Sequence, residues 1–384
     1  MNIAILISSL TGGGAERVAS LIGNYYIGEG HNVYYFIGNY GVRKRYDVKG
    51  QVIDTDIRFI IGSSGIADLI KSVSRIRKLK RKYEIDIAIS FMEDFNYINI
   101  LSRGREKVFV RVCRILSIDP DHIKSIFLNR YILGFTYNMS DRVIVMSDYA
   151  VNDMNREWGV RKKKLYKISN PISTNEYSTE DKEEWQFGDK VIICVGRLAN
   201  EKQQNIAIKA FSVVCETDSS ARLILLGDGY NRKKIEKMIK QAGLSDRVHL
   251  LGFQKDIYYY LKHSKVFLMT SQTEGFPNAM LEALNAGLPV ISTDAPGGIG
   301  EILGKSHEDE NTKYCKYGIV TPYILDEDYN VKSITEGELQ LGNTILEVLN
   351  DADIYEKYHR QSLKRAKWYQ TERIMKRWNK LFLQ

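Results

Sequence analysis

The chain has 384 residues, 44% of them apolar and 27% charged, which is the composition of a globular protein long enough for two domains. No apolar run is long enough to cross a bilayer, and the 4 cysteines and 6 histidines are scattered without metal-ligand spacing. These features predict a protein of a reducing, cytosolic compartment and argue against a disulfide framework or a zinc site.

The positive net charge of +8 arises entirely from the first part of the chain. Residues 1 to 170 hold 27 Lys and Arg against 17 Asp and Glu, or +10, whereas residues 171 to 384 hold 28 against 30, or −2. Such asymmetry favours a partner with an anionic surface, either membrane lipid or nucleic acid.

The chain begins with the pattern of a strand, a glycine turn and a helix. Residues 2 to 10 form an aliphatic run, typical of a strand buried in a parallel sheet, and lack the basic segment of a signal peptide. Gly12, Gly13 and Gly14 follow, and glycines before a helix let backbone N–H groups approach a phosphate or a sugar. A dinucleotide fingerprint is not favoured, because Arg17 takes the place of its third glycine.

Two amphipathic stretches lie among the later strands of the first half, which we expect at residues 86 to 90, 107 to 112 and 142 to 146. Residues 70 to 83 set apolar side chains opposite seven Lys and Arg, and residues 122 to 139 are rich in Phe and Tyr. Each stretch is either an ordinary docked helix with a solvated basic face or a contact with anionic lipid. The apolar positions of the first stretch are Ile70, Val73, Ile76 and Leu79.

The second half shows the same alternation of strands and helices, and two of its strand ends carry candidate phosphate ligands. A strand at residues 190 to 195 runs into Gly196, Arg197 and, five residues on, Lys202. Arg can fork onto phosphate oxygens while Lys acts as a point charge, so the pair suits a diphosphate, although the same residues could form a plain surface loop. The next strand ends in a second glycine turn, with Gly227 and Gly229.

The third strand end is the most informative. Residues 273 to 289, TEGFPNAMLEALNAGLP, predict a loop followed by a helix that begins at Pro277, with Glu274 before the helix and Glu282 nearly two turns inside it. Eight helical residues separate two side chains by roughly 12 Å along the axis. That spacing is too long for a shared metal and suits one extended ligand held at two points. In isolation, both glutamates could equally be solvated residues on a helix surface.

Together these strand ends resemble the retaining glycosyltransferases of family 4, which have the GT-B fold. In open α/β sheets ligands bind at the carboxyl ends of strands, where all these groups are expected. The resemblance spans both halves. It rests on Gly12 to Gly14, the Asn170-Pro171 pair, GRL with EK at 196 to 202, GDG at 227 to 229, EGFPNAMLEALNAGLPVISTD at 274 to 294 and EIL at 301 to 303.

The resemblance implies an α/β protein with two Rossmann-like domains and a nucleotide sugar held by the second of them. Glu282 would bind the ribose hydroxyls, and Arg197 and Lys202 the diphosphate. Glu274 would hold the transferred sugar. The remaining implied donor contacts are Gly275, Phe276, Pro277, Asn278, Gly227 and Gly229, and the implied acceptor and phosphate loop consists of Gly12, Gly13, Gly14, Arg111 and Arg114. No metal and no cofactor is implied.

One departure from the family concerns the strand at residues 107 to 112. Many relatives carry a histidine just after it, whereas this chain has Cys113 and Arg114 there. A cysteine at such a place is more often a small core residue than a nucleophile. A second departure is the segment PGGIG at 296 to 300, which replaces the Ser-Gly-Pro-Arg of bacterial relatives and leaves the donor sugar open.

The implied partners are a nucleotide sugar, a polyprenyl-diphosphate-linked glycan acceptor and the anionic inner leaflet of the cell membrane, which would make the protein cytoplasmic and peripheral. Nucleic acid is not favoured, because no recognition motif or stacking platform is evident. A UDP-sugar is the favoured donor, and GDP-mannose is the alternative donor. A sugar-nucleotide epimerase is the alternative activity. The expected domains are residues 1–170, a linker at 171–189, residues 190–365, and a helix at 366–384 that returns to the first domain or forms a second interfacial anchor.

Overall fold

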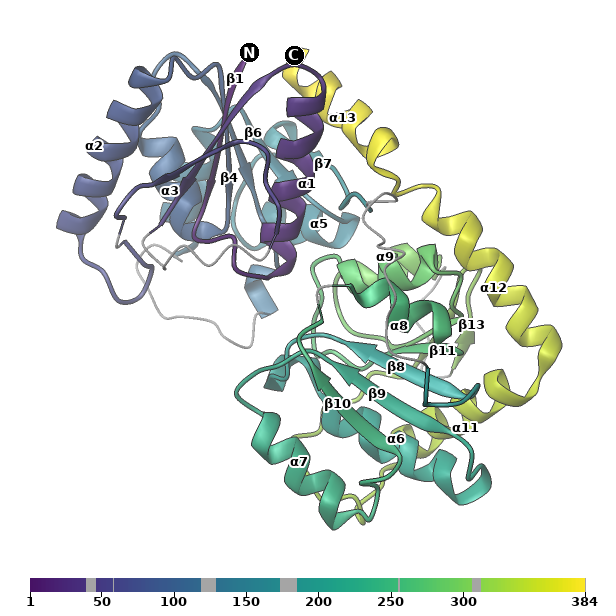
Figure 1. Ribbon diagram of the computed structural model, residues 1–384. Coiled ribbons are helices and arrows are strands. Elements are labelled where there is room, and N and C mark those ends of the chain that lie inside the picture. Colours follow the sequence, from purple (N-terminus) through teal and green to yellow (C-terminus); the bar gives the residue numbers. More distant parts are fainter. Residues whose placement is uncertain are drawn as a thin grey trace. The chain divides into compact units, whose positions relative to one another are not determined.

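The computed structural model describes residues 1–38, 46–57, 59–118, 129–172, 185–254, 256–305 and 312–383. Two compact units divide the chain, one formed by Met1–Pro171 with Thr371–Gln384 and the other by Ile172–Gln370 (Figure 1). Each unit encloses its own cluster of buried apolar side chains. Most of the linker expected at 171–189, residues 173–184, lies outside the described residues.

The first unit is built on a parallel sheet of strand order β3-β2-β1-β4-β5-β6-β7. Its strands are β1 (Asn2–Ile7), β2 (Asn32–Ile37), β3 (Gln51–Asp54), β4 (Ile87–Phe91), β5 (Lys107–Arg111), β6 (Arg142–Val145) and β7 (Leu165–Lys167). The helices are α1 (Gly14–Gly28), α2 (Ile66–Lys82), α3 (Glu93–Leu101), α4 (Arg130–Asn138), α5 (Asp148–Arg156) and α13 (Thr371–Leu383), with short 3-10 turns at Leu116–Ile118 and Lys162–Lys164. Central strands such as β1 and β4 are buried nearly throughout, as their aliphatic sequences predict.

The second unit repeats this plan with the order β10-β9-β8-β11-β12-β14-β13, in which only the edge strand β13 is antiparallel. Its strands are β8 (Val191–Val195), β9 (Arg222–Leu226), β10 (Val248–Gly252), β11 (Val266–Met269), β12 (Val290–Thr293), β13 (Lys313–Tyr314) and β14 (Ile319–Thr321). A 3-10 turn, η4 (Asn200–Lys202), precedes α6 (Gln204–Thr217). The other helices are α7 (Arg232–Gln241), α8 (Ile257–His263), α9 (Asn278–Asn285), α10 (Ile299–Leu303), α11 (Glu336–Asn350) and α12 (Ala352–Ala366).

Two mostly parallel Rossmann-like sheets confirm the predicted α/β class and the two predicted Rossmann-like domains. In each unit the strand order reverses beside the first strand, between β1 and β4 in the first and between β8 and β11 in the second. Crevices at the carboxyl ends of strands flanking such a reversal are where open α/β sheets bind ligands. No helix in the described residues is both long and apolar enough to cross a membrane.

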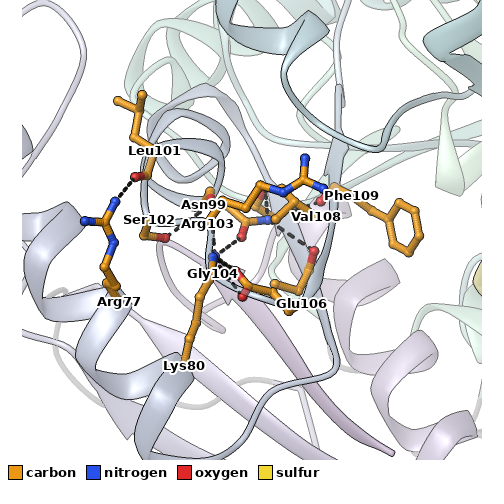
Figure 2. A network of polar contacts seen from close by, with 12 residues as sticks. Arg77, Lys80, Asn99, Leu101, Ser102, Arg103, Gly104, Glu106, Val108 and Phe109 are labelled. Carbon is orange, nitrogen blue, oxygen red and sulfur yellow. Dashed lines mark hydrogen bonds and ion pairs between the residues drawn. The ribbon is translucent and has the colours of Figure 1, made fainter.

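Helix α2 differs from its sequence pattern in two ways. Ile70, expected on the apolar face, is 63% exposed, and Lys80, expected among the solvated cations, is 4% exposed. Figure 2 shows that Lys80 reaches inward, where its Nζ lies 2.8 Å from Glu106 Oε1 and donates to Asn99 Oδ1 at 2.7 Å. Burial lowers the pKa of Lys80 to about 8, although Glu106 opposes the shift. The prediction of seven solvated cations was therefore wrong by one, because a buried carboxylate attracts Lys80.

The stretch expected as a helix at 366–384 contains one helix, α13, which begins at Thr371. Helix α12 ends at Ala366 and α13 belongs to the first unit, where it runs beside α1 (Figure 1). Trp378 is fully buried, and the Phe382 ring stacks on Tyr26 at 4.9 Å between centroids. Because this aromatic face of α13 is already buried against the first unit, the alternative of a second interfacial anchor is not supported.

Candidate functional site

The reversal point of the second unit brings together residues from two loops. The loop after β8 contains η4 with Lys202, and the loop after β11 contains Ser271 and Glu274. Hydrogen bonds join the loops, since Thr270 Oγ1 donates to Gln203 O at 2.9 Å and Gln272 N donates to Glu201 O at 2.9 Å. A small pocket opens between the ends of the two strands. It is lined by Cys194, Val195, Gly196, Lys202, Gln204, Leu268, Met269, Thr270 and Ser271.

Glu274 accepts two hydrogen bonds at one carboxylate oxygen within this site. Its Oε1 accepts from Lys202 Nζ at 2.6 Å and from Ser271 Oγ at 2.7 Å. Glu274 is 9% exposed, whereas the Lys202 side chain is 26% exposed. The buried carboxylate fixes the position of a cation that is partly open to solvent, which makes Lys202 a candidate ligand for an anion. Ser271 had not been predicted, although a hydroxyl three residues before Glu274 was visible in the sequence.

Glu282 lies on α9, and only 6% of it is exposed. Helix α9 begins at Asn278 with Pro277 as its N-cap residue, so Glu282 is little more than one turn inside the helix instead of nearly two. Phe276, just before the helix, is also buried, with its ring 5.5 Å from that of Tyr369. The alternative that Glu274 and Glu282 are solvated helix-surface residues is therefore wrong for both.

Arg197 points away from the core and is the most exposed charge of the site, at 60% of its side chain. Its guanidinium bonds Glu201 at 2.5 Å, four residues on. Burial opposes ionisation of Glu201, but the hydrogen bond from Arg197 holds the pKa of that carboxyl below its usual range. Tyr230 contributes a hydroxyl that accepts from Asn200 N at 3.0 Å. Arg197 and Lys202 thus lie on one loop, each supported by its own carboxylate.

The glycines of the second unit allow its loops to interlock. A Cβ on Gly227 would lie 1.9 Å from Gly196 O, and one on Gly229 would lie 2.3 Å from Leu198 O. Leu198 N donates to Asp228 O at 3.1 Å, which joins the two turns. These contacts give both glycines a packing role next to Arg197, and direct contact with the donor stays a prediction.

The backbone of Glu274 packs closely against a second glycine turn, at Gly297 and Gly298. Glu274 O accepts from Gly298 N at 2.9 Å, and a Cβ on Gly297, which has a φ of 122°, would lie 1.8 Å from that oxygen. A Cβ on Gly298 would meet Gly275 O at 2.7 Å. The segment that departs from the bacterial pattern therefore fixes the backbone of the predicted sugar-binding loop. The two adjacent glycines soon after a buried strand were the signal that could have revealed this.

The reversal point of the first unit is chemically different. Gly12, Gly13 and Gly14 form the expected turn into α1, but a Cβ on Gly13 would lie 2.3 Å from Glu16 Oε2. The carboxylate of Glu16 therefore lies over the N-terminus of α1, the place that the glycine pattern predicts for a phosphate. A carboxylate there already complements the helix dipole, which weakens the site for an anion.

Arg111 and Arg114, both predicted to meet the acceptor, occupy different environments. Arg111 is 1% exposed and donates to Ile168 O at 3.4 Å and to Asn170 Oδ1. This burial does not support a contact between Arg111 and an acceptor phosphate. Arg114 is more open, with its side chain 32% exposed and its Nη2 3.0 Å from Glu93 Oε2.

The strand ends around Arg114 add carboxylates and a thiol. Glu93 is 3% exposed, its Oε1 has no hydrogen-bond partner, and it follows Met92, which has a φ of 67°. Burial raises the pKa of Cys113 to about 11, so the thiol is neutral at pH 7 and suits a packing role, not that of a nucleophile. Within the described ranges, no three His, Cys, Asp or Glu side chains gather where they could hold a metal ion.

Comparison with known proteins decides the family. Residues 12–176 match the model of Glycosyltransferase Family 4, and residues 178–316 match that of Glycosyl transferases group 1. An uncharacterized glycosyltransferase of Methanocaldococcus jannaschii is 31% identical over 344 residues, which are 82% of this chain and 83% of that protein. The chain is a family 4 glycosyltransferase.

Two further matches extend over the whole glycosyltransferase. One is the Campylobacter jejuni alpha-1,4-N-acetyl-D-galactosaminyltransferase named for GalNAc-alpha-(1->4)-GalNAc-alpha-(1->3)-diNAcBac-PP-undecaprenol, 23% identical over 99% of this chain and 98% of that protein. The other is the structure of Anabaena HepE in complex with UDP-glucose, with a TM-score of 0.75, 20% identity and coverage of 99% of both chains. The latter shows that the fold is shared, which confirms the predicted GT-B fold.

Proposed function

We propose that this glycosyltransferase is a retaining enzyme that moves a hexose or N-acetylhexosamine from a UDP-sugar to a polyprenyl-diphosphate-linked glycan. The observation that carries the proposal is the Lys202–Glu274 pair, held by Ser271 at the reversal point of the second sheet. Two cations, Lys202 and Arg197, lie on one loop at this strand end, and each is paired with a carboxylate, which supports a role in stabilising a departing nucleoside diphosphate.

In the proposed reaction the bond between the sugar C1 and the diphosphate oxygen breaks while the acceptor oxygen bonds C1 on the same face. The leaving phosphate takes the acceptor proton, so atoms and charges balance without a dedicated base. Lys202 and Arg197 stabilise the negative charge that develops on the diphosphate, which is the role that a metal ion serves elsewhere. We therefore propose a metal-independent reaction in which Glu274 orients the sugar and Glu282 the ribose.

The choice of substrates draws on the relatives. The Campylobacter jejuni protein is named for an undecaprenol-diphosphate-linked acceptor, and HepE was solved with UDP-glucose. The excess of 27 Lys and Arg over 17 Asp and Glu in residues 1 to 170 suits an anionic lipid surface and a diphosphate-linked acceptor. The proposed location is therefore the inner face of the cell membrane, where the enzyme would be peripheral.

The first experiment identifies the donor. Thermal shift against UDP, GDP, UDP-hexoses, UDP-N-acetylhexosamines and GDP-mannose should reveal a UDP ligand, since a ligand at 100 times its Kd adds about 2.7 kcal/mol of stability. Stabilisation by GDP-mannose alone would move the assignment to a mannosyltransferase. Product analysis then separates a transferase, which releases UDP, from an epimerase, which returns an isomerised nucleotide sugar. Activity lost in EDTA and restored by Mg²⁺ would contradict metal independence.

The second experiment tests the site. Glu282→Ala should lower donor turnover at least about tenfold, because a buried carboxylate that binds the ribose is lost. Glu216→Ala, at an exposed position of the same unit, is the matched control and should leave turnover unchanged. Equal turnover in both variants would remove Glu282 from the donor site.

A further inference from the structure

Helix α4 exposes an apolar stripe to solvent. Tyr131 is 81% exposed, Phe135 74% and Met139, the C-cap residue, 44%, and they follow one another at a spacing of four residues. Ile132 beside them is 36% exposed. We call these four residues the α4 stripe. Three large side chains on one face of a helix form a contiguous apolar surface, which on a folded protein marks an interaction site.

The orientation of α4 is fixed by its other face. Leu133 and Tyr137 are fully buried, and the Tyr137 hydroxyl accepts from Asn96 Nδ2 at 3.1 Å. Gly134 packs so closely that a Cβ there would lie 2.3 Å from Trp158 O. The helix therefore cannot turn to bury Phe135 without losing these contacts, and the exposure of the α4 stripe is built into the fold.

Positive charge gathers at the C-terminal end of α4. Arg103 Nη1 donates to Met139 O at 2.8 Å and Lys164 Nζ donates to Ser140 O at 2.7 Å, which places both cations beside the stripe. Burial and the nearby Arg142, Arg161 and Arg103 lower the pKa of Lys164, although Asp141 opposes the shift. We use the term basic collar for the cationic residues of this region, which are Arg103, Arg142, Arg161, Lys162, Lys163 and Lys164.

We infer that the α4 stripe and the basic collar form the surface with which this unit docks on an anionic lipid membrane. Aromatic side chains are favoured at the boundary between headgroups and acyl chains, and Lys and Arg beside them meet lipid phosphates. Helices α2 and α4 both pack against α3, so the exposed cations of α2 lie on the same side of the sheet and add long-range attraction.

Two alternatives fit less well, namely a second copy of the chain on α4 and membrane docking through α2. In a two-fold pairing of α4 with its copy, cations meet cations, because Arg130 lies at one end of the helix and the collar at the other. Docking through α2 offers Ile66 and Ile70 as its large exposed apolar side chains, and neither of them is aromatic. A lipid surface accommodates the α4 stripe and the collar together.

Vesicle sedimentation tests the inference with the full chain. It uses vesicles of phosphatidylcholine with about one third phosphatidylglycerol, and vesicles of phosphatidylcholine alone. We expect binding only to the anionic vesicles, weakened by salt. Tyr131→Ser with Phe135→Ser should lower the partition coefficient at least about tenfold. Lys162→Gln with Lys163→Gln should lower it by up to about 25-fold, since each cation contributes about fivefold at low salt.

The matched control is Tyr323→Ser with Leu325→Ser, which removes two exposed apolar side chains of the second unit and should leave binding unchanged. Unchanged melting temperatures show that the variants fold. Three results would overturn the inference: no binding of the unaltered chain, full binding of the Tyr131 and Phe135 variant, or loss of binding only in Ile66→Ser with Ile70→Ser. If the unaltered chain does not bind, a change of molecular mass in light scattering would assign the α4 stripe to a protein partner instead.

This docking surface rests on the proposed function, which places the enzyme at a membrane, but the two fail separately. The vesicles contain no glycan acceptor, so binding is measured without catalysis. Binding without transferase activity refutes the proposed reaction alone. Transfer by a chain that does not bind vesicles refutes the docking surface alone.

Discussion

The two units share one strand order but place different chemistry where that order reverses. In the second unit, Lys202 and Glu274 come from the two loops that flank the reversal and meet at 2.6 Å. In the first unit, the helices that follow the equivalent strands, α1 and α3, contribute Glu16 and Glu93, and the cation Arg114 comes from beyond the next strand. The second site therefore presents a supported cation, and the first is rich in carboxylates.

The glycine turns show the same contrast. Gly13 meets the end of the flexible Glu16 side chain, whereas Gly227 and Gly297 meet backbone oxygens of neighbouring loops. Similar glycine patterns thus leave room for a side chain in one unit and join two backbones in the other. The fold provides the position of a site, and the side chains at that position decide what it binds.

The largest expected effect is on kcat, and it compares the cation of the second reversal point, Lys202, with that of the first, Arg114. Lys202→Met should lower kcat about 10³-fold, because in the proposed reaction the leaving diphosphate loses a stabilising charge and Glu274 loses its cation partner. Arg114→Met should instead raise the KM for the acceptor by about tenfold or less and leave donor hydrolysis unchanged. Steady-state kinetics with both substrates varied measure the difference.

Two outcomes would contradict this division. A fall in donor hydrolysis in the Arg114 variant would place that cation at the diphosphate. A Lys202 variant with full kcat and a higher acceptor KM would reverse the two assignments. Lys240→Met, on α7 and at an exposed position, serves as the control for the loss of a lysine.

The next effect concerns stability and compares the glycines. Gly297→Ala should destabilise the second unit by roughly 3 kcal/mol or more, because a Cβ at a φ of 122° would lie 1.8 Å from Glu274 O. Gly13→Ala should cost about 1 kcal/mol or less, since only the end of the Glu16 side chain must move. Urea unfolding of both variants gives the comparison, and equal losses would refute the distinction.

The sequence predicted the fold class and the identity of the strand ends because both depend on local patterns. Aliphatic runs marked β1 and β8, and the spacing between Arg197 and Lys202 marked a loop that does lie at a strand end. The burial of Glu274 and Glu282 was not predictable from the motif alone, since the same pattern fits a solvated helix surface.

Features that depend on contacts distant in sequence were missed. Lys80 enters the core because Glu106 and Asn99 meet it there, although its position in the helical pattern is that of a solvated cation. The pairing of Glu93 with Arg114 joins the ends of two neighbouring strands, and no local spacing reveals it. The Gly297 contact with Glu274 likewise exists only once β11 and β12 are adjacent.

The smallest expected effect concerns Asp94, a carboxylate of the first unit whose burial is only partly offset by a hydrogen bond. Burial raises the pKa of Asp94 to about 6, although its carboxylate accepts from Ile61 N at 2.8 Å. The folded state thus binds a proton more tightly than the unfolded chain, and stability is lost as the pH rises from about 4 through about 6. Asp94→Asn should stabilise the protein by about 2 kcal/mol at neutral pH, because the amide oxygen still accepts from Ile61 without a buried charge.

The pH dependence makes the test specific. Near pH 4 the carboxyl of Asp94 is protonated in the folded state and about half protonated in the unfolded chain, so most of the advantage of Asp94→Asn should disappear there. Chemical denaturation of both proteins at acid and neutral pH measures it, with Asp148→Asn, at an aspartate whose side chain is 73% exposed, as the control that changes little at either pH. An advantage that persists undiminished at acid pH would show that it does not come from the buried charge. The ionised carboxyl of Asp94 would then cost the first unit no stability, as for Glu201 of the second unit, whose pKa is lowered.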